Sequence, residues 1–169
     1  MLKDYDNKYN LSKIIVASPA FWREYLTELL EKGELKEKIL SSTCNSVDID
    51  GINEVLRRPE IITALKEDLV VKELNIVEEL LVEIRKNNLA VYGLAETENA
   101  VTMGAVRALL ITDSLIHRTR EQGTYEQIDS MMKQVDSMKG EIDIIGSEHD
   151  GGKKLDGLGG IGALLRYKI

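Results

Sequence analysis

The end of the chain is dense in glycine, and this segment limits what the chain can fold into. Residues 146–162 lead into an apolar run, Ile161–Tyr167. Gly157, Gly159 and Gly162 match the spacing G-x-G-x-x-G of a dinucleotide-binding turn. That fingerprint requires a strand before it, a helix that opens at its last glycine, and an acidic residue about 20 positions later. No acidic residue follows Gly162, so the match is incomplete.

A phosphate-binding loop of the Walker type is also excluded by the residues present. Gly146 and Gly151 have the right spacing, but Gly152 stands where the lysine is required. No Ser or Thr follows Lys154 to bind a nucleotide-associated magnesium ion. We therefore predict that the glycines have a conformational role without a cofactor, within a loop.

The composition indicates a folded protein of one ordinary domain or two small ones. The chain has 169 residues, of which 43% are hydrophobic and 30% charged, and this balance is unlike that of a disordered chain. A single cysteine, Cys44, cannot form an internal disulfide or a cysteine-based zinc cluster. Residues 1–6 are charged, unlike a signal peptide, and no apolar run approaches the roughly 18 residues of a membrane span. We expect a cytoplasmic protein.

The net charge of −7 argues against a dedicated nucleic-acid binder, because such domains carry a basic stripe. Basic residues occur only as local pairs, at Arg57-Arg58, at Lys153-Lys154, and at Arg166 with Lys168. Any contact with RNA is then expected to be auxiliary to a contact with protein.

The pattern along residues 1–59 predicts one or two strands and two helices. An apolar strand is expected at residues 14–17, followed by a helix whose apolar face includes Phe21 and Leu30 and which ends at Gly33. Residues 41–46 are small and polar, which predicts a loop. Asp50 is expected to cap a second helix that Pro59 ends.

Residues 60–169 alternate between helical and strand patterns, which predicts an α/β fold. Helices are expected at 60–87, with a possible break near 70–75, at 97–103, and at 125–138. Strands are expected at 89–93, 108–112, 141–145 and 161–167, and residues 115–122 are expected to form a surface connection. We place a domain boundary between residues 59 and 60. One strand cannot form a sheet alone, so the strand at 14–17 either pairs with the second domain or belongs to an incomplete first domain. We expect the first domain to be incomplete.

Several motifs resemble the Pelota family, paralogues of the archaeal and eukaryotic peptide-chain release factor. The resemblance to its C-terminal domain rests on residues 89–94, 98–106, 109–113, 147–149, 155–161 and 163–167. Residues 51–58, Gly-Ile-Asn-Glu-Val-Leu-Arg-Arg, are similar to the end of its central domain. So is Ser18-Pro19-Ala20-Phe21, although Ala20 stands where the family usually has glycine. The cysteine-bearing insertion of the release factor itself is absent.

This resemblance implies a fold and a domain organisation. The family has three domains and about twice this length. Residues 1–59 are expected to be the C-terminal part of a ribonuclease-H-like central domain. Residues 60–169 are expected to be the C-terminal α/β sandwich domain, similar to kink-turn-binding ribosomal proteins. The Sm-like N-terminal domain of the family is not expected in this chain.

The resemblance also points to partner-binding residues. His149 lies between Glu148 and Asp150, but three consecutive residues cannot easily all face one metal ion. In the family this loop lies near the surface that contacts a GTPase, so Glu148, His149 and Gly151 are predicted partner contacts. Two further predicted contacts, on the central domain, are Pro19 and Phe21; a strand-to-helix turn with a core aromatic is the alternative reading of that pair.

The function implied is ribosome rescue, in which the factor recognises stalled ribosomes and promotes subunit dissociation. The implied partners are archaeal elongation factor 1 alpha in its GTP form, the ribosome, and an ABC-class recycling ATPase. No catalytic residue, metal site or cofactor is expected in this chain, although a divalent metal is conceivable for the full-length family. Two alternatives remain: a divalent-metal-dependent endonuclease that cuts stalled mRNA, and direct kink-turn RNA binding suggested by the fold alone.

Overall fold

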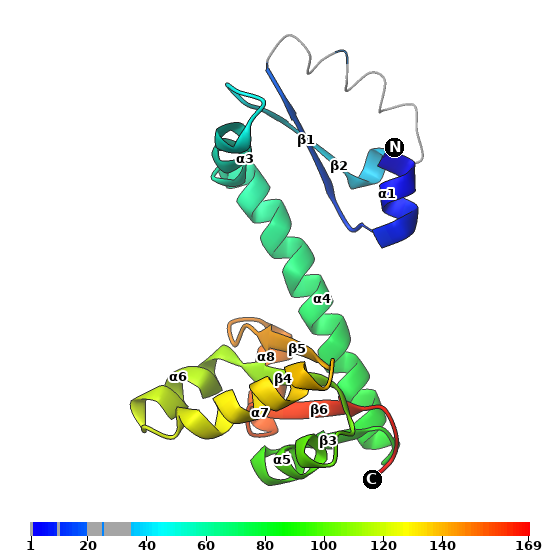
Figure 1. Cartoon of the computed structure of the whole chain (residues 1–169), viewed down its shortest axis with the longest axis vertical. Helices are drawn as coiled ribbons and strands as arrows, with labels where there is room; N and C mark the ends of the chain where they lie inside the picture. Colours follow the sequence, from blue (N-terminus) through cyan, green and yellow to red (C-terminus); the bar gives the residue numbers. More distant parts are fainter. Residues whose placement is uncertain (1, 10, 20–24, 26–34) are drawn as a thin grey trace. The chain divides into compact units, whose positions relative to one another are not determined.

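The computed structural model describes residues 2–9, 11–19, 25 and 35–169, which belong to two compact units, Met1–Asp68 and Leu69–Ile169 (Figure 1). Helix α4 (Pro59–Arg85) begins in the first unit and ends in the second. The domain boundary expected between residues 59 and 60 stays a prediction. Within the described residues, no helix combines the length and the apolar character needed to cross a membrane.

The first unit contains two parallel strands, β1 (Ile14–Ser18) and β2 (Ile39–Thr43), with Ile14 opposite Ile39. Its other described elements are α1 (Leu2–Tyr9), the 3-10 helix η1 (Lys36–Lys38) and α3 (Ile49–Leu56). The predicted strand at 14–17 is confirmed. The loop predicted at 41–46 is wrong up to Thr43, because pairing with β1 outweighs the weak intrinsic preferences of small polar residues. The helix predicted from Phe21 to Leu30 lies outside the described residues, except at Tyr25.

The start of α3 differs from the prediction by two residues. The N-cap is Asp48 instead of Asp50, and its carboxylate accepts hydrogen bonds from the backbone N–H groups of Asp50 and Gly51 at 3.0 and 3.2 Å. An extended residue whose side chain reaches the first free N–H groups is what a cap requires, and Asp50 already lies within the first turn. Pro59 is the first residue of α4, a position where its missing N–H costs no hydrogen bond.

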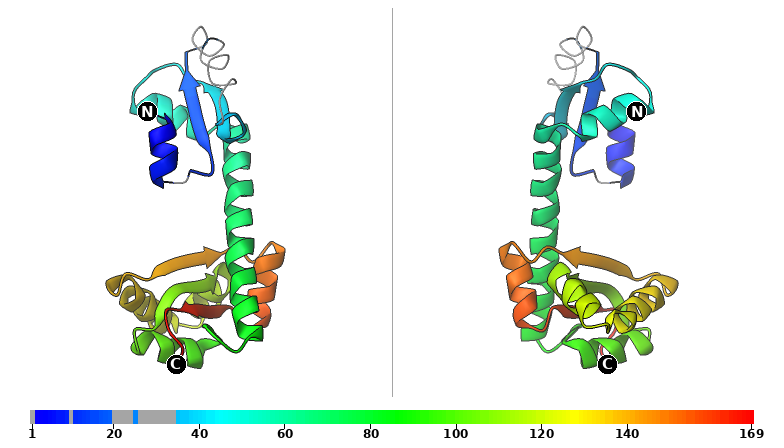
Figure 2. Two further views of the ribbon diagram at one scale, coloured as in Figure 1. Left: turned by 90° about the vertical axis from the view of Figure 1, so that its right-hand side faces the viewer. Right: turned by 90° about the vertical axis from the view of Figure 1, so that its left-hand side faces the viewer.

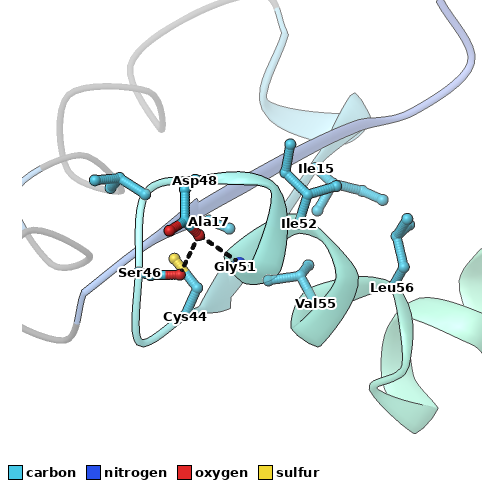
Figure 3. Close-up of a pocket in the computed structure, with 10 residues that line it drawn as sticks. Ile15, Ala17, Cys44, Ser46, Asp48, Gly51, Ile52, Val55 and Leu56 are labelled. Carbon is cyan, nitrogen blue, oxygen red and sulfur yellow. Dashed lines mark hydrogen bonds between the residues drawn. The ribbon is translucent and has the colours of Figure 1, made fainter.

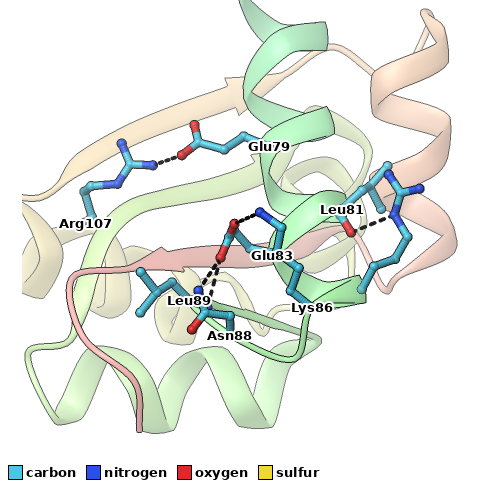
Figure 4. A network of polar contacts seen from close by, with 8 residues as sticks. Glu79, Leu81, Glu83, Lys86, Asn88, Leu89 and Arg107 are labelled. Atoms are coloured by element: carbon cyan, nitrogen blue, oxygen red, sulfur yellow. Dashed lines mark hydrogen bonds and ion pairs between the residues drawn. The ribbon is translucent and has the colours of Figure 1, made fainter.

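Helix α4 is continuous through residues 70–75, so the possible break there is not present. Its C-terminal end is closed by Glu83, whose carboxylate accepts from the Lys86 ammonium (3.0 Å), the Asn88 amide (2.8 Å) and the Leu89 backbone (3.4 Å), as Figure 4 shows. Asn87 adopts a positive φ of 49°, which turns the chain out of the helix. These contacts direct the chain into the first strand of the second unit.

The second unit is built on a four-stranded mixed sheet in the order β3-β6-β4-β5. The strands are β3 (Ala90–Tyr92), β4 (Val106–Thr112), β5 (Glu141–Ile145) and β6 (Ile161–Leu165). Strand β6 is antiparallel to both β3 and β4, whereas β4 and β5 are parallel. All four strands predicted in this half of the chain are therefore confirmed.

Helices cover both faces of this sheet (Figure 2). Alternate residues of β4 point to opposite faces: Leu109 and Ile111 pack with α5, α6 and α7, and Ala108 and Leu110 pack with α4 and α8. The covering helices are α5 (Leu94–Thr102), α6 (Asp113–Glu121), α7 (Tyr125–Ser137) and α8 (Asp150–Gly157). A strand that is buried on both sides explains the continuous apolar run in its sequence.

Two predictions for this half of the chain are wrong. Residues 115–122, expected to be a surface connection, belong almost entirely to α6, and Leu115 and Ile116 are buried in the core. Residues 150–157, expected to be part of a glycine-rich loop, form α8. In both segments few residues are apolar, so periodicity gives little signal, and contacts with the rest of the unit stabilise the helix.

Candidate functional site

The candidate site is the loop Gly146–His149, which connects β5 to α8. Because β4 and β5 are parallel and Thr112 lies opposite Ile145, both strands end at the same edge of the sheet. Helices α6 and α8 begin at this edge, directly after Thr112 and His149. In open α/β sheets, the carboxyl ends of parallel strands and adjacent helix N-termini commonly form binding sites.

The side chain of His149 is held from both ring nitrogens. Its Nδ1 accepts a hydrogen bond from the backbone N–H of Gly152 at 3.4 Å, which makes His149 the N-cap of α8. Its Nε2 lies 2.6 Å from Oε2 of Glu73, on α4. These two contacts require the tautomer that carries its proton on Nε2, since Nδ1 acts as an acceptor. The ring therefore stabilises the fold at this edge, with only 16% of its side chain exposed.

Glu73 is the anchor of the loop. Its carboxylate is buried and also accepts from the backbone N–H of Gly146 at 2.9 Å. On the other side of the loop, the backbone N–H of Ser147 donates to Oδ1 of Asp113 at 3.0 Å. The pKa of Asp113 lies below its ordinary value. The main cause is a hydrogen bond from the side chain of Ser147, and the backbone N–H of Ser147 contributes a smaller part.

This arrangement decides what the loop can bind. Backbone N–H groups of a loop at two helix N-termini are the usual ligands of a phosphate. Here the N–H groups of Gly146 and Ser147 are already bonded to carboxylates of the same chain. Those carboxylates would also repel an anion. The geometry favours recognition of a protein surface over binding of a nucleotide.

Two of the three glycines of α8, Gly151 and Gly152, lie in close contact with their surroundings. A Cβ atom on Gly152 would lie 2.1 Å from the carbonyl oxygen of Gly146, which is closer than any real contact. A Cβ on Gly151 would lie 3.2 Å from Cε1 of His149 and 3.3 Å from Leu74. The helix can approach the loop only because these two residues have no side chain.

The glycines that match the dinucleotide fingerprint lie between secondary-structure elements in the opposite order from a nucleotide-binding turn. They lead from a helix into a strand, α8 to β6, instead of from a strand into a helix. Gly159 and Gly160 have φ values of 101° and 81°, in the region that favours glycine. A Cβ on Gly162 would lie 2.9 Å from Leu80, so α4 packs directly on the strand there.

A partly buried hydroxyl network joins α6 to α8. Asp156 of α8 accepts hydrogen bonds from the hydroxyls of Thr112 (2.6 Å) and Ser114 (2.7 Å). The hydroxyl of Thr112 also accepts from the backbone N–H of Leu115 at 3.2 Å, as the N-cap of α6. The same network thus fixes the first turn of α6 against the last turns of α8.

The predicted contact residues are only partly brought together. Glu148, His149 and Gly151 are neighbours, but Gly151 is buried and His149 is turned inward, so Glu148 is the exposed member. Pro19 follows β1 in the other unit, and Phe21 lies outside the described residues. Their roles as partner contacts stay predictions.

The sequence reasoning did not single out Glu73, Asp113 or Asp156. A signal for Glu73 did exist, because it lies four residues before Val77 and seven before Leu80, in register with the buried stripe of α4. An acidic residue in such a register must find a partner in the folded protein. No signal identified His149 as that partner.

The first unit contains a separate pocket of about 410 Å³, shown in Figure 3. It is mostly apolar, and its lining includes Ile15 and Ala17 from β1, Cys44, and Ile52 and Val55 from α3. Within the described residues, no set of three or more His, Cys, Asp or Glu side chains is placed to hold a metal ion.

Comparison with known proteins gives a consistent result. Residues 70–169 match the family eRF1 domain 3. The protein pelota homolog of Pyrococcus furiosus is 35% identical over 170 residues, which cover 99% of this chain and 47% of that protein. The chain thus spans about half the length of the curated relatives it matches.

Two solved structures share the fold and confirm the predicted α/β class. Ribosome-bound archaeal Pelota, described together with ABCE1, has a TM-score of 0.71 and 34% identity, over 99% of this chain and 47% of that one. Dom34 of S. cerevisiae, described as a translation termination-like factor that takes part in RNA quality control and interacts with Hbs1, has a TM-score of 0.60 and 29% identity, over 100% of this chain and 50% of that one.

Proposed function

The chain belongs to the Pelota family, with an eRF1 domain 3 at residues 70–169, and from this premise we propose that it is the partner-binding part of a ribosome rescue factor. The whole protein would recognise stalled ribosomes in the cytoplasm and promote separation of the subunits. This part would contribute contacts with other proteins and break no covalent bond itself.

The observation that supports this proposal most is the similarity to ribosome-bound archaeal Pelota, which extends over 99% of this chain. That relative is described with ABCE1, and Dom34 is described as interacting with Hbs1. By analogy, we propose the ribosome and an ABC-class ATPase as partners of this protein. The geometry of the loop Gly146–His149 agrees with a role in protein contact, because its N–H groups are used internally while Glu148 is exposed.

We further propose that the GTPase partner is archaeal elongation factor 1 alpha in its GTP form. The interface would include Glu148 beside His149 and Gly151 on the second unit, and Pro19 and Phe21 on the first. Glu148 would make the direct contact on its unit, whereas His149 and Gly151 would hold the loop in shape. No cofactor is proposed for this chain.

The test is calorimetric titration of the chain with archaeal elongation factor 1 alpha, loaded with a GTP analogue or with GDP. We expect saturable binding that is tighter in the GTP state. If a chain shown to be folded by circular dichroism binds neither form at high micromolar concentration, the GTPase-contact proposal for these residues is wrong.

The endonuclease alternative is separated by a second assay on the same sample. The chain would be incubated with a labelled mRNA fragment and Mg²⁺ or Mn²⁺, with EDTA as the control. Cleavage that depends on the metal and persists through purification to homogeneity would favour the endonuclease. RNA that stays intact under all conditions would favour the proposed role in protein interaction.

A further inference from the structure

The last residues of the chain fasten the C-terminal ends of three helices. The Arg166 guanidinium donates to the carbonyl of Met138 after α7 at 2.8 Å, and the Tyr167 hydroxyl donates to the carbonyl of Met103 after α5 at 2.8 Å. The Lys168 ammonium donates to the carbonyl of Asn87 after α4 at 2.9 Å. Carbonyls at helix C-termini lack partners within the helix, so these donors satisfy them and hold the surface rigid.

Three large apolar side chains are exposed on this surface. Met103 is 53% exposed, Met138 is 37% exposed, and Tyr167 is 49% exposed. They are adjacent, because Tyr167 bonds to the backbone of Met103, and a Cβ on the next residue, Gly104, would lie 3.3 Å from the sulfur of Met138. We call these three residues, together with Lys139, Arg166 and Lys168, the C-terminal patch. Exposed methionine and tyrosine side chains are frequent at protein interfaces because they adapt to an apolar partner.

The cations of the patch have no acidic partners. Within residues 69–169, all of which the structure describes, Lys139, Arg166 and Lys168 form no ion pair. Other cations of the unit do so: Lys86 with Glu83, Arg107 with Glu79 (Figure 4), Lys133 with Asp129, and Lys154 with Glu78. Arg85, Arg118, Arg120 and Lys153 of the same unit also form no ion pair, so what distinguishes the patch is that its three unpaired cations lie beside exposed apolar side chains in a chain of net charge −7. The patch is complementary to an acidic surface.

The backbone of Lys139 gives an independent indication. This residue follows α7 with φ at 57°, in the left-handed region where glycine or asparagine is favoured. This conformation closes the C-terminal end of α7, where the N–H groups of Lys139 and Gly140 donate to the carbonyls of Asp136 and Val135. A lysine is less favourable there than glycine, and within residues 69–169 its side chain forms no hydrogen bond or ion pair. Strained residues of this kind often serve a function instead of stability.

We infer that the C-terminal patch binds an acidic protein segment that carries a large apolar side chain. The apolar residue would pack on Met103, Met138 and Tyr167, and the acidic residues would face Lys139, Arg166 and Lys168. Because Arg166 and Tyr167 are already held by hydrogen bonds, little conformational freedom is lost on binding. A nucleic acid would interact with the cations of the patch, but the exposed methionines would add little to its affinity.

This inference deepens the proposed function, since it assigns a surface and a chemistry to one of its protein partners. The first experiment is an NMR titration of the ¹⁵N-labelled chain with a 12-residue peptide of Asp and Glu around a central Leu-Phe. A second peptide with Ser-Ser at the centre and a single-stranded RNA of equal charge serve as comparisons. We expect shifts at residues 103–104, 138–140 and 166–168, and at least tenfold weaker binding of the other two ligands.

Substitutions separate recognition from folding. Met103→Glu and Lys139→Glu are expected to weaken peptide binding at least tenfold, while the control Lys133→Glu, on α7 and outside the patch, leaves it unchanged. Lys139→Gly is diagnostic, because it should raise the melting temperature through relief of strain and yet lower the affinity. If the patch had only a structural role, the substitutions would change the melting temperature and leave the affinity for the peptide unchanged.

The outcome is interpretable whatever the GTPase titration shows. Peptide shifts confined to the patch, lost in Met103→Glu, support the inference even if elongation factor 1 alpha does not bind. Shifts elsewhere, equal affinity of the Lys139 and Lys133 variants, or preference for the RNA would overturn it and leave the proposed function standing on its own titration.

Discussion

The imidazole Nε2 of His149 lies 2.6 Å from a carboxylate oxygen of Glu73, and the two residues are 76 positions apart in the chain. One contact thereby joins α4 to the first residue before α8. The same carboxylate oxygen holds the backbone of Gly146, so a single buried side chain positions both ends of the loop that carries Glu148.

Replacement of Glu73 is expected to destabilise the second unit. Glu73→Ala leaves the N–H of Gly146 and the ring of His149 without their acceptor, at a cost of about 1–3 kcal/mol in the free energy of unfolding. The measurement is urea denaturation followed by circular dichroism. The matched control is Glu78→Ala on the same helix, whose exposed pair with Lys154 should be worth less than about 1 kcal/mol. Equal effects of the two variants would contradict the role of Glu73.

Two glycines of α8 should respond in opposite directions to the same substitution. Gly152→Ala places a Cβ 2.1 Å from the carbonyl of Gly146 and should cost about 1–3 kcal/mol or more. Gly157→Ala meets nothing within 4 Å and should stabilise the helix by up to about 1 kcal/mol. Thermal denaturation of both variants checks this. A neutral Gly152→Ala would mean that the loop and α8 do not pack as described.

The partly buried hydroxyl network makes a third prediction. Asp156→Ala removes the shared acceptor of the Thr112 and Ser114 hydroxyls and should cost about 1–2 kcal/mol, because Ser114 is half-buried and Thr112 keeps only a longer bond to the carbonyl of Gly160, at 3.3 Å. Hydrogen exchange should show the loss at the first turn of α6, which the network holds. Asp136→Ala, an exposed aspartate on α7, is the control and should change stability by less than about 0.5 kcal/mol.

The depressed pKa of Asp113 predicts how stability depends on pH. Since its carboxylate has a lower pKa folded than unfolded, ionised Asp113 stabilises the protein above the unfolded value of about 3.9. This contribution is lost as pH falls through the folded pKa. Asp113→Asn should therefore be less stable than the natural protein at pH 7, and the difference should shrink below about pH 4. Denaturation curves between pH 2 and pH 7 measure it; a difference that grows at low pH would have the wrong sign.

The exposed position of Glu148 gives the functional prediction. Glu148→Lys should leave the melting temperature unchanged, because its side chain has no hydrogen-bond partner within residues 69–169. It should lower the affinity for GTP-loaded elongation factor 1 alpha by about fivefold or more, roughly 1 kcal/mol. Calorimetry is the measurement, and Glu126→Lys on the first turn of α7 is the control. Unchanged affinity would remove Glu148 from the proposed interface.

Local sequence patterns were sufficient to predict the secondary structure where apolar residues are concentrated. The strands at 14–17, 89–93, 108–112, 141–145 and 161–167 were predictable because short apolar runs between turn residues have few other stable conformations. Helices α5 and α7 followed from their periodic apolar residues, and both end near a glycine. The motifs that resemble the Pelota family were sufficient to indicate the family from the sequence.

Local patterns failed where a helix depends on distant residues. Residues 150–157 contain three glycines, which predicts a loop, yet they form α8. The helix is stabilised because His149 caps it while bonded to Glu73, and because Gly152 allows close packing on Gly146. The prediction for residues 115–122 failed similarly, since the cap of α6 is Thr112, which Asp156 holds from 44 residues away.

By itself, then, the sequence determined the α/β class, the four strands of the second unit and the family, because hydrophobic periodicity and short motifs are properties of neighbouring residues. Only the tertiary structure decided which of the predicted contact residues face solvent. Glu148 is exposed, whereas His149 is held inward by the Glu73 carboxylate on α4, and Gly151 is buried beside His149 and Leu74. The physical reason is that a buried polar group must find its partner in three dimensions, and the spacing of residues along the chain does not specify that partner.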